Sequence, residues 1–133
     1  MEFEVLQDGH ELSPNYHFFN EHGVYVFVAG DNDPAWFNRP RPKGRYVSTA
    51  WIPGNLLAEG TMIVGAAITT REPEVVHLFE REAVAFQVVD NLDGDSGRGG
   101  YIGHIPGVVR PVLKWDTRYT SEQCETEAFL APR

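Results

Sequence analysis

The chain contains very little cysteine, with Cys124 as the single thiol among its 133 residues. One cysteine cannot form a disulfide within the chain, so the fold has to be held together by its core. A domain of this length can bury about two-thirds of its unfolded surface and needs no covalent staple. A protein without disulfides suits a reducing compartment, and we therefore expect a cytoplasmic location.

The sequence also lacks a long apolar run. No stretch approaches the roughly 18 consecutive apolar residues that a membrane-spanning helix requires. The first residues carry Glu2 and Glu4 where a secretory signal would carry bases, and no apolar segment follows them. We therefore expect neither a signal peptide nor direct insertion into a membrane.

Positive charge is scarce in this chain. It has 11 Lys and Arg against 19 Asp and Glu, which gives a formal net charge of -8. Proteins that bind nucleic acid usually present a basic field to the phosphates, so this balance argues against nucleic acid as a partner. Residues 39–45 form a basic cluster stiffened by proline. This cluster suits either a solvated connector or a contact with an acidic sugar or an acidic partner surface.

Motifs for catalysis, nucleotide binding and metal binding are missing. The phosphate-binding pattern GxxxxGK[ST] and the nucleophile elbow GxSxG are absent, and no two histidines are two or four residues apart. Residues 90–100 are rich in Asp and Gly, but they place Ser96 where a calcium-binding loop needs glycine. We expect no catalytic residue, no metal and no cofactor, and hence a protein that is not an enzyme.

Alternation of apolar and polar residues, punctuated by Gly, Pro, Asn and Asp, predicts about seven strands and no long helix. The predicted strands are residues 3–6, 15–20, 23–29, 45–52, 61–70, 83–89 and 108–115. Short turns are expected at residues 21–23, 55–59 and 73–81. Strands of this number and spacing indicate an all-β, antiparallel sandwich of Ig-like or jelly-roll type, between which the pattern does not distinguish.

Aromatic side chains are the residues best suited to bind a sugar, because the apolar face of a pyranose can stack on a ring. Most aromatics on sandwich strands face the core, which we expect for Phe27, Tyr46 and Phe86. Trp36 lies in a loop-like segment, where it suits either a ligand contact or the anchoring of that loop. The alternation around Trp51 places its side chain on an outer face.

Four blocks of the sequence suggest a family. They are NEHGVYVF at residues 20–27, the segment 44–57 that ends in IPGNLL, AFQVVD at residues 85–90, and residues 98–115, which open with RGGY. In their order and spacing over residues 3–116, these blocks resemble the carbohydrate-binding C-terminal domain of polysaccharide and O-antigen ABC-exporter ATP-binding subunits, the Wzt type.

The resemblance implies an Ig-like β-sandwich of seven or eight strands over residues 1–116, followed by a polar extension over residues 117–133. The module would form a homodimer, with exchange of a strand between protomers. It would recognise an O-antigen-type polysaccharide for export during lipopolysaccharide biosynthesis, without catalysis. Its partners would be the ATPase and membrane subunits of the ABC transporter, which would hold it peripherally at the inner membrane.

On this reading the ligand lies on a sheet face or in a groove, and six residues are predicted to contact it. Trp36 and Tyr101 would stack on sugar rings. The remaining predicted contacts are hydrogen bonds from Asp31, Arg98 and His104, and a further contact from Trp51.

The sequence departs from the family pattern in two places. The ATPase domain has no counterpart here and would lie on a parent chain, and one or more strands that precede the position of Phe3 in the family are absent. We expect a partner chain or residues 117–133 to cover the sheet edge left behind.

An alternative stays open, namely a structural or dimerisation domain of a polysaccharide export or biosynthesis assembly that binds no sugar. An enzyme acting on glycans is disfavoured. The acids Asp93 and Asp95 lie in one flexible loop, which rarely holds two carboxyls at the fixed separation that glycoside hydrolysis needs.

Overall fold

The computed structural model describes residues 1–121 and shows an all-β protein in which all paired strands run antiparallel. The expected all-β, antiparallel class is thereby confirmed. The described part of the chain contains eight strands and no helix. The strands are β1 (Glu2–Val5), β2 (His10–Glu11), β3 (Ser13–Asn20), β4 (Tyr25–Gly30), β5 (Pro40–Arg41), β6 (Gly44–Val47), β7 (Gly60–Thr70) and β8 (Val75–Val88).

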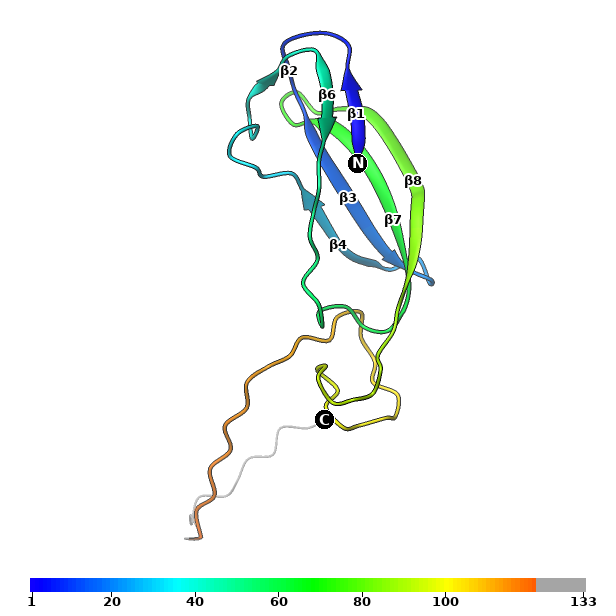
Figure 1. Ribbon diagram of the computed structural model, residues 1–133, viewed down its shortest axis with the longest axis vertical. Helices are drawn as coiled ribbons and strands as arrows, with labels where there is room; N and C mark the ends of the chain where they lie inside the picture. Colours follow the sequence, from blue (N-terminus) through cyan, green and yellow to red (C-terminus); the bar gives the residue numbers. More distant parts are fainter. Residues whose placement is uncertain (122–133) are drawn as a thin grey trace.

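The body of the molecule is a four-stranded sheet in the order β4-β3-β7-β8 (Figure 1). β3 and β4 form the predicted hairpin, whose turn places Gly23 at a φ of 75°, a conformation that glycine adopts without strain. The Asn20 side chain accepts hydrogen bonds from the backbone N–H groups of His22 and Val24 at 2.9 and 3.0 Å. These bonds satisfy the turn and explain why the chain reverses here.

The core lies against the two central strands, β3 and β7. Of the four residues that the alternation over residues 61–70 places on one side, Met62, Val64 and Ile68 are buried, whereas Ala66, next to an irregularity in the β7–β8 register, is half-buried. The other buried apolar residues are Val5, Phe18, Phe19, Ala58 and Ala67. The central position of β7, with a neighbour on each side, explains why this strand carries the largest share of the core.

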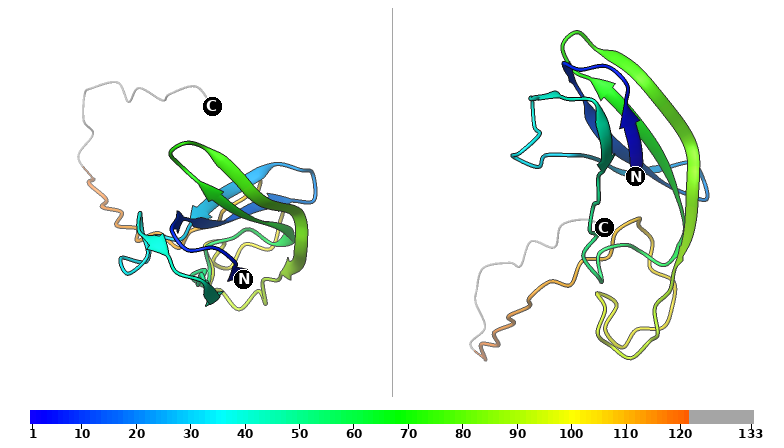
Figure 2. Two further views of the ribbon diagram at one scale, coloured as in Figure 1. Left: turned by 90° about the horizontal axis from the view of Figure 1, so that it is seen from above. Right: turned by 45° about the horizontal axis from the view of Figure 1, so that its top comes forward.

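Two smaller sheets, β1–β6 and β2–β5, complete the regular structure. The β1–β6 pair lies in front of one face of the large sheet near one end, while residues 90–121 lie beyond its opposite end (Figures 1 and 2). The short strands β2 and β5 pair antiparallel, with Glu11 opposite Pro40 and His10 opposite Arg41. They bring the base of the 31–39 loop next to the start of β3.

The strand predicted over residues 45–52 is shorter in the structure, where β6 ends at Val47. Its partner β1 begins at Glu2, so the last backbone bond of the pair runs from Ser48 N–H to the carbonyl of Met1, at 2.8 Å. Beyond this point the chain has no neighbouring strand to pair with, and residues 48–52 continue without regular structure.

The short turn predicted over residues 73–81 is wrong. The turn occupies residues 71–74, and β8 starts at Val75. Residues 75–79 read Val-Val-His-Leu-Phe, which is rich in the β-branched and aromatic residues that favour strands. The strand predicted over residues 83–89 is therefore the second half of a strand of 14 residues.

The strand predicted over residues 108–115 is also wrong. Val109 forms an isolated bridge with Leu57, supported by backbone bonds from Arg110 N–H to Leu56 and from Ala58 N–H to Val108. Pro111 follows directly and has no N–H with which to extend the pairing. Residues 111–121 therefore form no strand.

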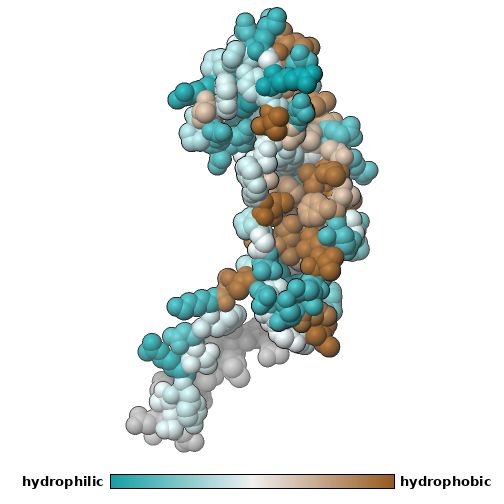
Figure 3. All heavy atoms as spheres, viewed as in Figure 1, coloured by the Kyte–Doolittle hydropathy of each residue, from teal (hydrophilic) through white to brown (hydrophobic). Residues whose placement is uncertain are grey.

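β8 is less buried than the alternation suggests. Phe86, expected in the core, is 37% exposed, and Val84 is 58% exposed. β8 pairs only with β7 within residues 1–121, so its second edge has no neighbour there. Figure 3 shows apolar side chains gathered on the viewed face where β7 and β8 run. Most of the predicted extension over residues 117–133, including Cys124, lies outside the described residues.

Candidate functional site

The 31–39 loop is anchored by a buried arginine. The Arg41 side chain is 2% exposed, and its guanidinium carbon lies 5.1, 5.5 and 5.6 Å from the ring centroids of Tyr46, Trp36 and Phe3. Trp36 meets Tyr46 edge-on at 5.2 Å, and Phe3 stacks on Tyr46 at 5.5 Å. The three rings supply the electron-rich faces that a desolvated guanidinium needs. Of the two roles left open for Trp36, the structure shows the anchoring contact.

Asp31 joins this cluster to the large sheet. Its carboxylate lies 3.6 Å from the Arg41 guanidinium and accepts a hydrogen bond from the Ser48 hydroxyl at 3.0 Å. Its backbone N–H donates to the carbonyl of Pro14 at 2.8 Å, and its other carboxylate oxygen accepts the N–H of Asp33. Asp31 is therefore held in one position at the end of β4, where the loop begins.

One hollow of about 400 Å³ opens on one side of Asp31, and we name it the Trp51 hollow. The Trp51 side chain is 85% exposed, so its indole is free to meet a ligand. The polar groups that line the hollow belong to Tyr16, Asp31, Asn32, Ser48 and Thr49. The hollow thus places an exposed ring next to hydroxyl, amide and carboxylate groups.

Tyr16 is a hydrogen-bonding group within this hollow. Its hydroxyl donates to the Ser48 carbonyl at 3.1 Å. Partial burial, and to a smaller extent the negative charge of Asp31, raises the pKa of Tyr16 above its usual value. The same hydroxyl accepts a hydrogen bond from the N-terminal ammonium of Met1, so within the chain it both donates and accepts.

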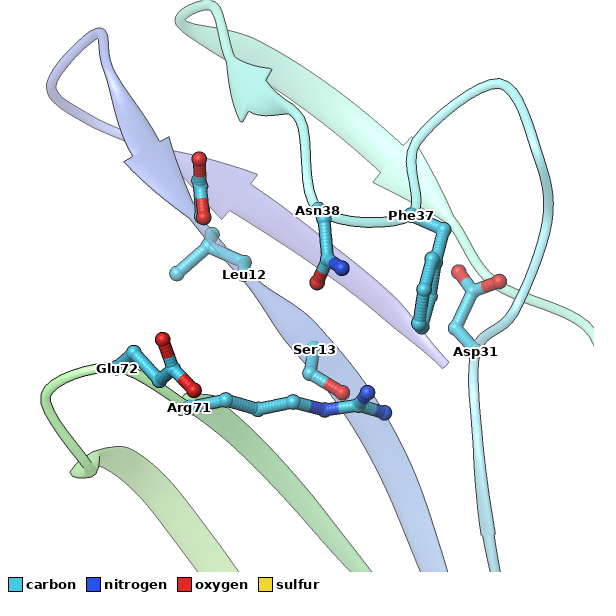
Figure 4. A pocket seen from close by; sticks show the side chains of 8 residues that line it. Leu12, Ser13, Asp31, Phe37, Asn38, Arg71 and Glu72 are labelled. Atoms are coloured by element: carbon cyan, nitrogen blue, oxygen red, sulfur yellow. The ribbon is translucent and has the colours of Figure 1, made fainter.

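A second hollow of about 340 Å³ opens beside Asp31, and we name it the Phe37 hollow (Figure 4). Its lining residues are Glu11, Leu12, Ser13, Asp31, Phe37, Asn38, Arg71 and Glu72. In Figure 4, Phe37 and Asn38 point from the loop toward Ser13 and Arg71, which belong to β3 and to the turn before β8. The hollow therefore combines a ring, an amide, a guanidinium and carboxylates.

The local sequence explains how Phe37 reaches this position. Asp33 accepts hydrogen bonds from the N–H groups of Ala35, Trp36 and Phe37 at 2.9 to 3.0 Å, which closes a tight turn. Asn38 follows with a φ of 53°, in the left-handed region that asparagine tolerates better than most residues. The chain then reverses, with Trp36 on the Arg41 cluster and Phe37 in the hollow.

The Arg71 side chain lies beside Gly30 of β4. A Cβ at Gly30 would lie 3.4 Å from Arg71 Nη2, so the arginine runs closely across this glycine. The guanidinium carbon ends 5.0 Å from the Phe37 ring centroid. Within residues 1–121, Arg71 forms no ion pair, which leaves its N–H donors available to a ligand.

The predicted residue Arg98 lies in a different charged cluster, at the far end of the sheet. Its side chain is 5% exposed, donates to the carbonyls of Tyr101 and Gly103 at 2.8 and 2.9 Å, and pairs with Glu59 and Asp90. Glu59 also pairs with Arg110. These bonds tie the 90–110 loop to the segment before β7, so the Arg98 guanidinium is used within the chain.

The pKa values of both carboxyls in this cluster lie below their usual range. For Glu59, burial acts in the opposite direction but is outweighed by hydrogen bonds from its own N–H and from Arg98, and by the charges of Arg110 and Arg98. The pKa of Asp90 is lowered mainly by a hydrogen bond from the Ser96 hydroxyl and by the N–H of Leu92. Both groups are therefore ionised at neutral pH.

Tyr101 and His104 lie on the same 90–110 loop. Both are exposed, and the Tyr101 ring lies so close to Gly103 that a Cβ there would come within 2.4 Å of its hydroxyl. His104 lines a hollow of about 490 Å³ together with Asn20, Met62 and other residues of the hairpin and β7. Neither residue lines the hollows beside Asp31.

The six predicted binding residues thus fall into two groups. Asp31 and Trp51 line the Trp51 hollow, and Trp36 packs on the Arg41 cluster next to them. Arg98, Tyr101 and His104 lie together on the 90–110 loop, beyond the other end of the sheet (Figure 1). Sequence reasoning missed Tyr16, Phe37, Asn38 and Arg71. The adjacency of Phe37 to Trp36 in a turn-rich segment was the one available indication.

Two further observations concern residues 1–121. They contain no helix that is long and apolar enough to cross a membrane. They also contain no group of three or more His, Cys, Asp or Glu side chains placed to hold a metal ion.

The chain matches no protein-family model, and a search among curated proteins gives no match.

Proposed function

We propose that this chain is a non-catalytic carbohydrate-binding module that recognises an O-antigen-type polysaccharide for export by an ABC transporter. The observation that carries the proposal is the Trp51 hollow, where an indole that is 85% exposed lies beside the polar groups of Asp31, Asn32 and Thr49. A ring that is free on the surface offers a stacking face, and the neighbouring groups can read hydroxyls.

The order of the four sequence blocks supports the choice of polysaccharide and transporter. The segment 44–57 contributes Ser48, Thr49 and Trp51 to the hollow, so one of the blocks that carries the resemblance also builds the candidate site. On this proposal the module acts in the cytoplasm, beside the inner membrane, with the ATPase and membrane subunits as partners.

We also infer that the complete fold is an Ig-like sandwich. The β1–β6 pair in front of one face of the large sheet supports two layers (Figure 2). The exposed apolar residues of β8 are explained if a second layer packs on the face of β8 in an assembled protein.

The proposal is tested with an array of bacterial O-polysaccharides and by replacing Trp51. We expect selective binding to one polymer family and, for Trp51→Ala, an affinity lower by about tenfold, because a stacking contact contributes about 1–1.5 kcal/mol. The matched control is Trp115→Ala, which removes an indole that is 82% exposed and lies in neither hollow. Equal affinity of the two variants in titration calorimetry would contradict the assignment of the hollow.

The open edge of β8 favours a second candidate function, that of an assembly domain. β8 is long, has no neighbour on one side within residues 1–121, and exposes Val84, Phe86 and Leu78. Such an edge is a template for pairing with a second chain. A stable dimer that binds none of the arrayed polysaccharides would favour this function over sugar recognition.

A further inference from the structure

We propose that the Phe37 hollow is a second carbohydrate site, which binds one uncharged sugar independently of the Trp51 hollow. The two sites lie on opposite faces of the sheet, so one chain contacts two separate sugars. This inference rests on the proposed function, from which it takes the class of ligand, and deepens it by adding a site. It assigns binding roles to Ser13, Phe37, Asn38 and Arg71.

The register of the sheet separates the two hollows. Tyr16 and Ala29 pair across β3 and β4, so their side chains share one face of the sheet, and both line the Trp51 hollow. Ser13 lies three residues before Tyr16 in the same strand, so its side chain points to the other face, where it lines the Phe37 hollow. Asp31 follows β4 and lines both hollows, but the sheet lies between them.

The guanidinium of Arg71 lies on the same face as Ser13. A Cβ at Gly30 would be 3.4 Å from Arg71 Nη2 and 3.8 Å from Ser13 Oγ, so both polar groups lie on one side of β4. Phe37 and Asn38 point toward them from the 31–39 loop (Figure 4). The Phe37 hollow is therefore a slot between this loop and one face of the sheet.

Three polar groups of the slot have no partner in the described part of the chain. Within residues 1–121, the Arg71 guanidinium forms neither an ion pair nor a hydrogen bond, and the Asn38 amide and the Ser13 hydroxyl form no hydrogen bond. Together they offer N–H and O–H donors and two acceptor oxygens. Such convergence of a few polar groups in a hollow is typical of a ligand site.

The ring and the size of the slot suit a single sugar. Phe37 is 41% exposed, so part of its ring is open to the apolar face of a pyranose. The Arg71 guanidinium lies 5.0 Å from the ring centroid, which places N–H donors beside the ring. The volume of about 340 Å³ is near the lower end of the range for sites that hold one small ligand.

The charges around the slot favour an uncharged sugar. The carboxylates of Glu11, Asp31 and Glu72 line it together with one guanidinium, that of Arg71. Asp31 is paired with Arg41, 3.6 Å away, which leaves two carboxylates against one guanidinium. Carboxylates accept hydrogen bonds from sugar hydroxyls but repel a uronate or a phosphate.

Amide chemical shifts can follow the two sites separately. The probes are neutral polymers (mannan, galactan and rhamnan), the acidic polygalacturonate, and the polysaccharide that the array selects, each also hydrolysed to its monosaccharide. We expect the best-binding neutral monosaccharide to shift two groups of amides, residues 48–51 and residues 36–38 with 71–72, along separate titration curves. Galacturonic acid should bind the second group about fivefold more weakly.

Variants separate the second site from the first. Phe37→Ala should weaken binding at residues 36–38 about five- to tenfold and leave the curve for residues 48–51 unchanged. Phe37→Tyr keeps a ring and is the matched control, with the affinity of the parent chain. Arg71→Gln should weaken the second site about two- to tenfold, and Trp51→Ala should weaken only the first. Thermal unfolding verifies the fold of each variant.

The outcomes distinguish this inference from the proposed function. A single group of shifted amides at residues 48–51, or a second group whose affinity Phe37→Ala and Arg71→Gln both leave unchanged, would overturn the second site and leave the Trp51 hollow intact. Loss of both groups in a folded Phe37→Ala variant would overturn their independence. Tighter binding of galacturonic acid at the second site would overturn the uncharged ligand. Absence of binding to every glycan would overturn the proposed function and this inference together.

Discussion

At the scale of single residues, Arg41 is the most deeply buried charged side chain within residues 1–121. It combines near-complete burial, an ion pair with Asp31, and contacts with three aromatic rings. A buried guanidinium is costly to desolvate, so the surrounding groups have to compensate for lost hydration. Removing it would leave Asp31 without its cation and a cavity among the rings.

We therefore expect Arg41→Ala to lower the free energy of unfolding by about 2–4 kcal/mol, measured in urea by tryptophan fluorescence. Arg45→Ala is the matched control. Arg45 is exposed and lies 3.6 Å from Glu2, and a surface pair of this kind contributes at most about 1 kcal/mol. If both variants lose the same small amount, Arg41 is not the anchor of the loop.

Part of the candidate site could be predicted from residues alone. Alternation predicts an outer position for the Trp51 side chain. Asp31 is predicted as a binding residue, and it lies in the same loop-like segment as Trp36. Arg71 could not be found in this way. Its contact with Phe37 depends on how the turn after β7 lies against the 31–39 loop, and no local pattern encodes a pairing between segments so far apart in the chain.

At the scale of elements, the 90–110 loop contains no helix or strand and is held in place by ion pairs. Glu59 lies between Arg98 and Arg110, and both arginines also donate to carbonyls of the loop. Gly97 allows this closure, because a Cβ there would come within 2.5 Å of the carbonyl of Pro111. The loop is thus held by ion pairs and close backbone packing.

This arrangement predicts a loss of loop stability in acid. The pKa values of Glu59 and Asp90 are lower in the folded chain than their ordinary values of 4.5 and 3.8. Groups of this kind stabilise the fold fully above their unfolded pKa and lose that contribution as pH falls through the folded pKa. We expect amide exchange in residues 90–110 to accelerate below about pH 4.5, before exchange in β7 does.

Hydrogen-exchange mass spectrometry between pH 3 and 7, corrected for intrinsic rates, measures this effect. Glu59→Gln is expected to show faster exchange in the same loop already at pH 7, with a weaker dependence on pH. A loop that exchanges at the same corrected rate across this range would contradict the role given to the two carboxyls.

The elements that the sequence predicts correctly are those whose signal lies within the segment itself, in turn residues or in apolar alternation. The hairpin of β3 and β4 has Asn20 and Gly23 in its turn, and β7 has a clear apolar alternation. The wrong predictions concern segments whose structure depends on pairing with a segment that is distant in the sequence. Residues 108–115 alternate as a strand does, but Pro111 ends their pairing with the 56–58 segment, and no periodicity shows whether a partner is present.

At the scale of the whole molecule, the uneven coverage of the large sheet is the main feature. β3 and β7 are buried between neighbours, whereas β8 exposes most of its length. Long edge strands with apolar residues are usually shielded in native proteins, since they otherwise promote association. The second edge of β8 is thus where a further chain is expected.

We expect the protein to sediment as a dimer and Val84→Lys to shift it toward monomer, because a charge on the exposed β8 face disfavours burial against a second copy. Val24→Lys is the control, since Val24 is similarly exposed but lies in the turn between β3 and β4. Analytical ultracentrifugation over a range of concentrations gives the dissociation constant. A wild-type chain that remains monomeric at high concentration would contradict this prediction.

The buried Arg41 also bears on how such a protein can diversify. It holds the base of the 31–39 loop from beneath, through rings that belong to other segments. Exposed loop residues outside these contacts, such as Asn32 and Pro34, can therefore be exchanged without disturbing the sheet. A scaffold built in this way can acquire a new binding specificity through a few substitutions in the loop, while selection for folding acts on Arg41 and the rings around it.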